Sequence, residues 1–380
     1  MKRDNQLNFW RFGSKPLHSL ARVLAVGVGI ATLAACSNHH DNAVDPRAGH
    51  ILISDQFNNR VIEVDSSGNI VWHFGNGPND FSASSIVGVN DAQAVGANTL
   101  MAGTGTPPNA PSNCPTNTTT GCADNRVLLV DSTGKILFQY GQFGVTGSGA
   151  NQLNTPVQAT WTPKGTILIT DQANQRIIEV DQMGNILWQY GQTGVSGIAA
   201  GQLNNPNAAE LLDNGHVLIS DENNSRAIEV DRKTAGNPIV ATFTAKGTVS
   251  GVAFASRLAN GNTLITDSNN SRIVEVDSGD NVVWQYFTND SSGNSAPLPT
   301  RAVRTSDGNT LISDQFNDRV IVVDVNKNIV RSLGKLNVIG YNTSNVAADG
   351  LSAPYDAKVI GDFTGLTPAF DSDGDGDDTP

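Results

Sequence analysis

Five aspartate–arginine pairs, and a sixth arginine without the usual partner, recur along this chain in the pattern Asp-x-x-Asn-x-Arg. Six guanidinium groups gathered in one place could bind an anionic ligand, but an aspartate five residues before an arginine could also pair with it bidentately. We expect the paired, structural arrangement, because the carboxylates neutralise the arginines. At Arg126 the usual aspartate is replaced by Gly103, and Asp124 is expected to substitute for it. The arginines of the six copies are Arg60, Arg126, Arg176, Arg226, Arg272 and Arg319.

A second repeated group places an aromatic side chain seven residues after another aspartate, as in Asp65 and Trp72. Such aromatic rings could form a platform for a carbohydrate or a quinone. Their presence in most copies instead favours packing of each ring against the neighbouring repeat. The aromatic residues of this set are Trp72, Phe138, Trp188 and Trp284.

Two cysteines, Cys114 and Cys122, lie in a stretch rich in proline, asparagine and threonine. A metal site would need histidines at a suitable spacing, and the sequence around these cysteines has none. In an oxidising compartment the two thiols are expected to form one local disulfide bond.

Alternating aspartates near the C-terminus, Asp371, Asp373 and Asp375, could supply the oxygen ligands that calcium prefers. This run resembles the start of an EF-hand or thrombospondin type 3 calcium loop, but the chain ends before the twelfth loop position, where a glutamate would lie. The resemblance implies a partial calcium site, and a solvated acidic tail over residues 363–380 is the alternative. No cofactor other than calcium is expected.

These groups recur because the sequence itself repeats, at a period of roughly 46 to 50 residues. Each repeat predicts four short strands separated by glycine and asparagine. In the third repeat the strands are expected at residues 156–162, 166–170, 176–181 and 185–190. Short strands at this spacing indicate an all-β array, and four strands per repeat at this period are typical of a β-propeller.

The number of strands predicts how the ring closes. Six sets of the second to fourth strands are present, but only five of them follow a first strand of their own. The missing first strand is expected at residues 354–360, where a Pro-x-x-Ala spacing recurs. We therefore predict an all-β, six-bladed β-propeller over residues 48–362, closed by a C-terminal strand that completes blade one and removes the exposed sheet edge. Residues 105–124 form an inserted loop in blade two.

The repeats resemble the NHL family of six-bladed propellers. The resemblance rests on a glycine-rich loop, a Gln-Leu-x-x-Pro segment before the first strand and the Asp-x-x-Asn-x-Arg pattern, and it covers nearly the whole mature chain. The chain departs from the family in blade two, with its insertion, and in blade four, where residues 238–243 lack the tryptophan. One full set of the matching residues is Gly191, Gly194, Gly201, Gln202, Leu203, Pro206, Asp221, Asn224 and Arg226.

The positions that do not repeat lie at the start of each first strand, which would be the innermost strand of its blade. Aligning the six copies on a shared alanine, Ala253 in the fifth, places polar residues of both charge signs at the mouth of the central channel, and places Val252 there in the fifth copy. This variation predicts a binding site, with the inserted loop as a partial lid. An arbitrary polar lining of a water-filled channel is the alternative. The candidate residues are Asn90, Asp91, Gln158, Asn207, Arg301, Tyr355 and Asp356.

The N-terminus indicates where the protein resides. Basic residues precede an apolar run at residues 23–35, which is too short to span a membrane. The run ends in Leu-Ala-Ala-Cys at Cys36, which resembles a bacterial lipobox and implies cleavage of residues 1–36 and lipidation of Cys36. Residues 37–47 would be a tether, and the absence of aspartate after Cys36 implies the outer membrane, with the protein facing the periplasm.

The net charge of −12 becomes more negative once the basic signal segment is removed. Such a surface disfavours nucleic acid and anionic membranes, so membrane contact is expected through the lipid anchor only. We predict a monomeric binding or scaffold module for a protein or a cell-envelope glycan.

The alternative is a hydrolase, a lyase or an arylsulfotransferase-like enzyme acting at the channel mouth. The Asp-x-x-Gly-Asn-x-x-Trp phrase resembles arylsulfotransferase-like propellers, but these enzymes and the propeller lyases depend on channel histidines. The histidines of the mature chain are His39, His40, His50, His73 and His216, and none can be assigned that role.

Overall fold

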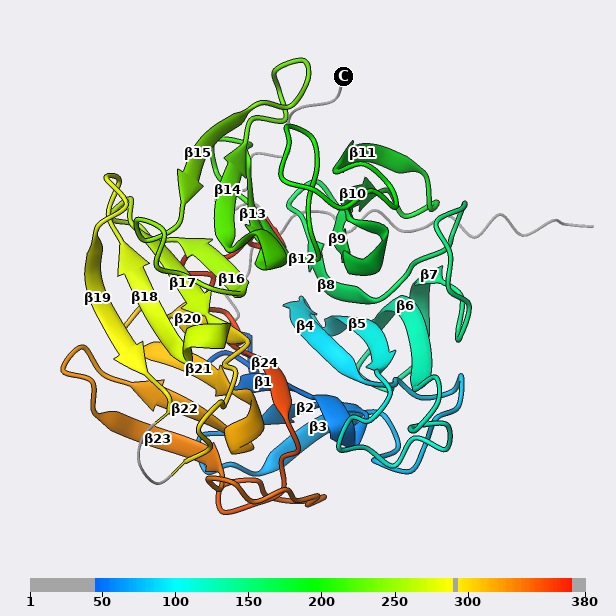
Figure 1. Cartoon of the computed structure of the whole chain (residues 1–380). Helices are drawn as coiled ribbons and strands as arrows, with labels where there is room; N and C mark the ends of the chain where they lie inside the picture. The colour runs from blue at the N-terminus through cyan, green and yellow to red at the C-terminus, as the bar shows by residue number, and fades with distance from the viewer. Residues whose placement is uncertain (1–44, 290–292, 371–380) are drawn as a thin grey trace, which may run out of the picture. The chain divides into compact units, whose positions relative to one another are not determined.

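The computed structural model describes residues 45–289 and 293–370. They form six four-stranded antiparallel sheets arranged as blades around a central axis (Figure 1). The fold is a six-bladed β-propeller. From the innermost to the outermost strand, the blades are β24 (Pro354–Val359), β1 (Ile51–Asp55), β2 (Arg60–Val64) and β3 (Ile70–Phe74); β4 (Val89–Val95), β5 (Asn98–Thr106), β6 (Cys122–Val130) and β7 (Ile136–Gly141); β8 (Pro156–Trp161), β9 (Ile167–Asp171), β10 (Arg176–Val180) and β11 (Ile186–Tyr190); β12 (Pro206–Leu211), β13 (Val217–Asp221), β14 (Arg226–Val230) and β15 (Ile239–Phe243); β16 (Val252–Arg257), β17 (Thr263–Asp267), β18 (Arg272–Val276) and β19 (Val282–Phe287); and β20 (Arg301–Arg304), β21 (Thr310–Asp314), β22 (Arg319–Val323) and β23 (Ile329–Gly334).

The ring is closed by the C-terminal strand, as the strand count predicts. β24 pairs antiparallel with β1, and Ala357 lies opposite Ile53. Figure 1 shows this late strand beside the earliest strands of the described chain. Blade one therefore holds both ends of the ring together, and the inner edge of β1 is paired rather than exposed.

The burial of each strand explains its sequence. The second and third strands of a blade are covered on both faces by neighbouring blades, so they are nearly continuous apolar runs. The outermost strands alternate, as in β3, where Val71 is exposed and Phe74 is buried. The core consequently consists of layers between blades. In one layer Ile177 of blade three packs with Ile219 and Ile228 of blade four.

The repeated aromatic residues pack between blades, as expected. Trp188 of β11 lies against the apolar layer between blades three and four, and its indole nitrogen donates to Asn237 at 3.1 Å. The guanidinium of Arg232 lies 4.9 Å from the ring centre. The Trp72 indole likewise donates to the carbonyl of Ser132 in the next blade, at 3.0 Å.

The repeated Asp–Arg pairs are structural, which confirms the prediction. In blade three, Arg176 Nε lies 2.8 Å from Asp171 Oδ2, and the other carboxylate oxygen accepts the backbone N–H of Asn154 at 2.8 Å. This pair therefore ties the turn between the second and third strands to the loop that precedes the blade, as the pairs of Asp55, Asp221 and Asp267 also do. Burial raises the pKa of Asp171, against the lowering effect of these donors. The equivalent distances are 2.8 Å for Arg60–Asp55, Arg226–Asp221 and Arg319–Asp314, and 2.6 Å for Arg272–Asp267.

Blade two builds the same pair from a different position. Asp124 lies 2.5 Å from Arg126 Nε, and its other oxygen accepts the backbone N–H of Val87 at 2.7 Å. A Cβ on Gly103 would lie 2.6 Å from the Asp124 carboxyl carbon. The carboxylate thus occupies the space of the missing side chain, which explains why residue 103 is glycine and confirms Asp124 as the substitute.

Residues 363–370, beyond the expected propeller boundary at residue 362, also pack into the ring. Leu366 lies against Ala208, Phe254 and Val303 on three inner strands. Thr367 donates from its backbone N–H and its hydroxyl to Glu210 Oε2, at 2.8 and 2.6 Å. This segment narrows the end of the channel at which the innermost strands finish.

We expect Gly103→Ala to destabilise the protein by about 1–3 kcal/mol, because the new methyl group collides with a buried carboxylate that cannot move without losing Arg126. In the background Asp124→Ala, which removes the carboxylate, the same glycine substitution should cost almost nothing. The measurement is a double-mutant cycle from denaturant unfolding of the four proteins. Equal costs of Gly103→Ala in the two backgrounds would contradict this account.

Candidate functional site

The six innermost strands surround the channel, and its mouth lies on the face where these strands begin (Figure 1). In five of them a register shift near the first residues produces a β-bulge, as between Val89 and Asp91. A bulge re-aims a side chain that would otherwise point away. It allows two consecutive residues, such as Asn90 and Asp91, both to contribute to the channel.

The structure corrects the alignment of blade five. Phe254 of β16 lies opposite Thr266, the register held by Gln158 and Thr170 in blade three. Phe254, rather than Val252, therefore lies at the channel position. The run Val-Ala-Phe-Ala contains two alanines two residues apart, and an alignment on Ala253 instead of Ala255 preserves the inside–outside alternation while shifting the register.

The channel mouth carries a chain of side-chain amides that joins three blades. Gln315 Nε2 donates to Gln56 Oε1 at 2.9 Å, and Gln56 Nε2 donates to Asn90 Oδ1 at 2.8 Å. The Tyr355 hydroxyl interacts with Asn90 and accepts a hydrogen bond from Asn207 Nδ2 at 3.0 Å. These contacts lock the orientation of each group, because an amide that donates on one side must accept on the other.

On the opposite side of the mouth this series of hydrogen-bonded side chains ends at a carboxylate. Glu222 Oε2 accepts Asn207 Nδ2 at 2.8 Å and Gln172 Nε2 at 3.3 Å. Burial raises the pKa of Glu222 and also that of the Tyr355 hydroxyl, which therefore stays protonated at physiological pH.

Sequence reasoning missed part of this set. Gln56, Gln172, Glu222 and Gln315 each follow the aspartate of an Asp-x-x-Asn-x-Arg copy and begin a short 3-10 turn. These turns are η1 (Gln56–Asn58), η2 (Gln172–Asn174), η3 (Glu222–Asn224) and η5 (Gln315–Asn317), and the equivalent turn of blade five, η4 (Ser268–Asn270), begins with serine. The sequence does indicate this position, because its residue varies while the aspartate, asparagine and arginine of the pattern stay constant.

Beneath the mouth lies an ionic layer made by Asp91, Arg301, Asp356 and Lys358. Arg301 Nη2 lies 2.7 Å from Asp91, and Arg301 Nε lies 2.8 Å from Asp356. Lys358 Nζ lies 2.6 Å from Asp91 and 2.9 Å from Asp356. Two carboxylates thus face two cations, and the Arg301 guanidinium stacks 4.1 Å from the ring centre of Phe254.

The two carboxylates of this layer have different proton affinities. Burial, reinforced by the neighbouring Asp356 carboxylate and opposed by Lys358 and Arg301, raises the pKa of Asp91 to about 6. Burial also acts to raise the pKa of Asp356, but Lys358 and Arg301 outweigh it, so this pKa lies below its usual value.

Gln158 holds the same register as the ionic layer, and Gln93 lies two residues beyond Asp91 along β4. Gln158 Nε2 donates to Glu210 Oε1 at 2.8 Å, and Gln158 Oε1 accepts the backbone N–H of Ala209. Gln93 Nε2 donates to the carbonyl of Thr367 in the C-terminal segment, at 3.1 Å. The C-terminal segment therefore narrows the channel at this end, where a pocket of about 20 Å³ remains beside Gln93 and Lys358.

A cavity of about 500 Å³ lies over the mouth, within the range of small-molecule sites. Of the predicted residues, Asn90 and Tyr355 line it, and Asn207 supports Tyr355. Asp91, Gln158, Arg301 and Asp356 lie one layer deeper and are buried. The polar and aromatic side chains of the lining are Gln56, Phe57, Asn90, Thr104, Thr106, Thr120, Asn125, Thr146, Asn154, Thr155, Gln172, Gln315, Phe316 and Tyr355.

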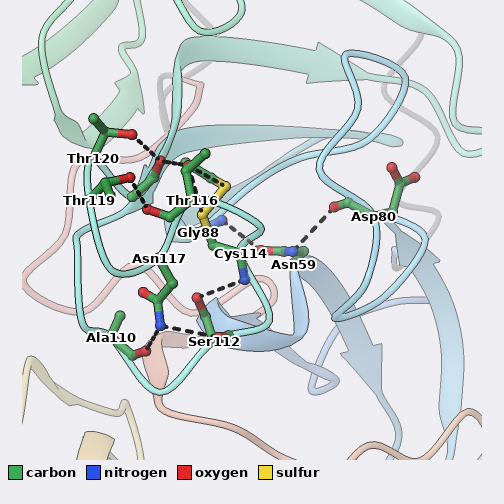
Figure 2. The surroundings of a disulfide bond; sticks show 12 residues. Asn59, Asp80, Gly88, Ala110, Ser112, Cys114, Thr116, Asn117, Thr119 and Thr120 are labelled. Carbon is green, nitrogen blue, oxygen red and sulfur yellow. Dashed lines mark hydrogen bonds between the residues drawn. A yellow bond between two sulfur atoms is a disulfide. The ribbon is translucent and has the colours of Figure 1, made fainter.

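The inserted loop forms one wall of this cavity, contributing Pro107, Pro108, Thr120 and Cys122. Cys114 and Cys122 form a disulfide bond, as predicted (Figure 2). Within the loop, Asn117 Nδ2 donates to the carbonyl of Ala110 at 2.8 Å. Ala110 in turn packs against Phe57, Phe316 and Ala353 of blades one and six, so the loop reaches from blade two across the mouth.

Catalytic and metal-binding groups are sparse in the part of the chain that the structure describes. None of the described histidines lines the mouth cavity, and His50 and His216 instead contact Glu63 and Glu229. Residues 45–289 and 293–370 contain no group of three or more His, Cys, Asp or Glu placed to hold a metal ion, and no helix among them is long and apolar enough to cross a membrane. Cys36, the signal segment and the calcium candidates Asp371, Asp373 and Asp375 lie outside the described residues.

Comparison with known proteins identifies the fold alone. No model of a known protein family and no curated protein matches the chain. Among solved structures, it is similar to a protein of unknown function from Bacteroides caccae, with 14% identity, a TM-score of 0.50 and coverage of 75% of this chain and 93% of that one. A catalytically inactive virginiamycin B lyase from Staphylococcus aureus with quinupristin matches at 12% identity and a TM-score of 0.43, covering 66% of this chain and 70% of that one. A streptogramin B lyase structure matches at 14% identity and the same TM-score, covering 78% and 81%.

We expect the ionic layer to give two opposite pH signatures. The folded-state pKa of Asp91, about 6, lies above its unfolded value near 3.8, so its contribution to stability is full below pH 3.8 and is lost as the pH rises through 6. Relative to wild type, Asp91→Asn should therefore gain up to roughly 3 kcal/mol between pH 4 and pH 7. Relative to wild type, Asp356→Asn should instead lose stability as the pH rises, because the lowered pKa of Asp356 stabilises the wild-type fold above its unfolded pKa.

The measurement is denaturant unfolding of the three proteins from about pH 2 to pH 7, because the contribution of Asp356 is lost only below its unfolded pKa of 3.8. The other buried aspartates contribute equally to all three proteins and cancel in the differences. Parallel pH dependences of the two variants would contradict the assignment.

Proposed function

We propose that this protein is an NHL-like propeller that works as a binding module in a bacterial cell envelope, with its ligand site at the mouth cavity. The observation that carries this proposal is the contrast between two layers of the channel. The charged side chains of the ionic layer neutralise one another, while the cavity above this layer is lined by oriented amide, hydroxyl and aromatic groups. Such a lining can hold a ligand but offers no nucleophile paired with a general base.

The described chain is compatible with attachment through a lipid at Cys36. It starts at Asp45 and leads into Ile51, at the end of β1 opposite the channel mouth. Lipidation, the outer membrane and the periplasm are parts of this proposal that rest on the lipobox resemblance.

The enzymatic alternative would require catalytic groups at the same mouth. The described lining supplies amides, hydroxyls and aromatic rings. We therefore favour binding, with a protein or a glycan of the envelope as the partner.

We expect the full-length protein, solubilised in detergent and immobilised, to retain a component of envelope extract through the mouth cavity. Gln56→Leu and Asn90→Leu should lower retention at least tenfold, since each leaves buried polar groups without partners. Gln93→Leu is the matched control, because it removes a buried amide of the same channel that lies below the ionic layer. Retention that is equal for all four proteins would place the binding site elsewhere.

We expect Cys36→Ser to release the protein from the membrane. In a bacterial host, wild type should partition into the detergent phase and the variant into the aqueous phase, because a single serine cannot carry the acyl chains that hold the body at the bilayer. The double variant Cys114→Ser/Cys122→Ser, which removes the other two cysteines, should partition as wild type does. Wild-type protein found in the aqueous phase would overturn the anchor.

A further inference from the structure

None of the residues that line the mouth cavity carries a charge at neutral pH. The Glu222 carboxylate lies beside this lining and accepts hydrogen bonds from Asn207 and Gln172. All of the lining residues are amides, hydroxyls, aromatic rings or apolar groups, although the chain as a whole has a net charge of −12. An ionised ligand that entered this space would lose its hydration without gaining a counter-charge, which is costly. The cavity therefore selects an uncharged ligand.

The amide chain of the mouth holds unused hydrogen-bonding capacity. An amide offers two N–H donors and a carbonyl oxygen with two lone pairs. The described contacts use one donor of Gln315, and one donor and one lone pair of Gln56. Donors and acceptors thus remain side by side on a rigid frame, and ligand groups that can both donate and accept satisfy such a frame best. Hydroxyl groups have this property.

Hydroxyl and aromatic groups complete the cavity. The hydroxyl of Thr106, on the wall that leads into the inserted loop, is buried and has no hydrogen-bond partner among the described residues. Phe57, Phe316 and Tyr355 add ring surfaces to the same space. A sugar ring presents hydroxyls around its edge and C–H groups on its faces, so its two kinds of surface match the two kinds of lining.

We infer that the mouth cavity binds an uncharged saccharide, reached as a chain end or a side branch because the buried ionic layer blocks passage through the channel. This inference rests on the proposed function and names its ligand class. The inserted loop forms the wall nearest the ligand, and the amides of Gln56, Asn90 and Gln315 hold the ligand's hydroxyls.

The test is titration calorimetry of the full-length protein in detergent with maltotriose, cellotriose, xylotriose and triacetylchitotriose as neutral probes. Trigalacturonate serves as the charged probe, and Gly-Pro-Gly-Gln with an acetylated N-terminus and an amidated C-terminus serves as an uncharged peptide. We expect at least one neutral trisaccharide to bind with a Kd below about 1 mM. Gln56→Leu and Asn90→Leu should weaken that binding about tenfold, whereas Gln93→Leu should leave it within twofold.

Other results overturn the inference. Binding of trigalacturonate or of the peptide in place of the neutral sugars would do so, as would the absence of binding to every neutral probe or equal binding by all variants. The envelope experiment separates this failure from failure of the proposed function. A retained component that protease destroys and periodate does not would leave the binding module standing and remove the saccharide, whereas no retained component would remove the binding module itself.

Discussion

The antiparallel pairing of β24 with β1 is the interaction on which the rest of the structure depends. It joins the last described strand to the first, and without it blade one would lack its inner strand and the ring would have an open edge. The same strand brings Tyr355 to the mouth and Asp356 and Lys358 to the ionic layer. The strand that closes the ring therefore also completes the channel.

Charge is distributed in this channel according to what burial costs. Asp91 and Asp356 are fully buried, so each must meet a cation, and Arg301 and Lys358 supply two positive charges for two negative ones. All four charged groups of the ionic layer are therefore paired. The mouth cavity above this layer is lined by polar but uncharged side chains, so the ion pairs and the accessible cavity lie in separate layers.

Repetition in this sequence reveals the fold but draws attention away from the residues that line the mouth cavity. The Asp–Arg pairs and the aromatic residues repeat because each blade must be tied to its turn and packed on its neighbour. The residue just after the repeated aspartate takes part neither in the ion pair nor in the packing between blades, because it begins a 3-10 turn at the mouth. Gln56, Gln172 and Gln315 at this position line the mouth cavity.

The sequence by itself determined the six blades, the closing strand, the Asp–Arg pairs, including Asp124, and the disulfide bond of the inserted loop. Each follows from local spacing, because four strands per repeat and paired residues recur at fixed intervals. Only the tertiary structure decided which polar residues share a layer. Asn90 and Asp91 are adjacent in the chain, yet a bulge places one on the cavity wall and the other in a buried ion cluster. Lys358 joins that cluster, Phe254 replaces Val252, and Gln56 meets Gln315, because the ring brings together strands that are far apart in sequence.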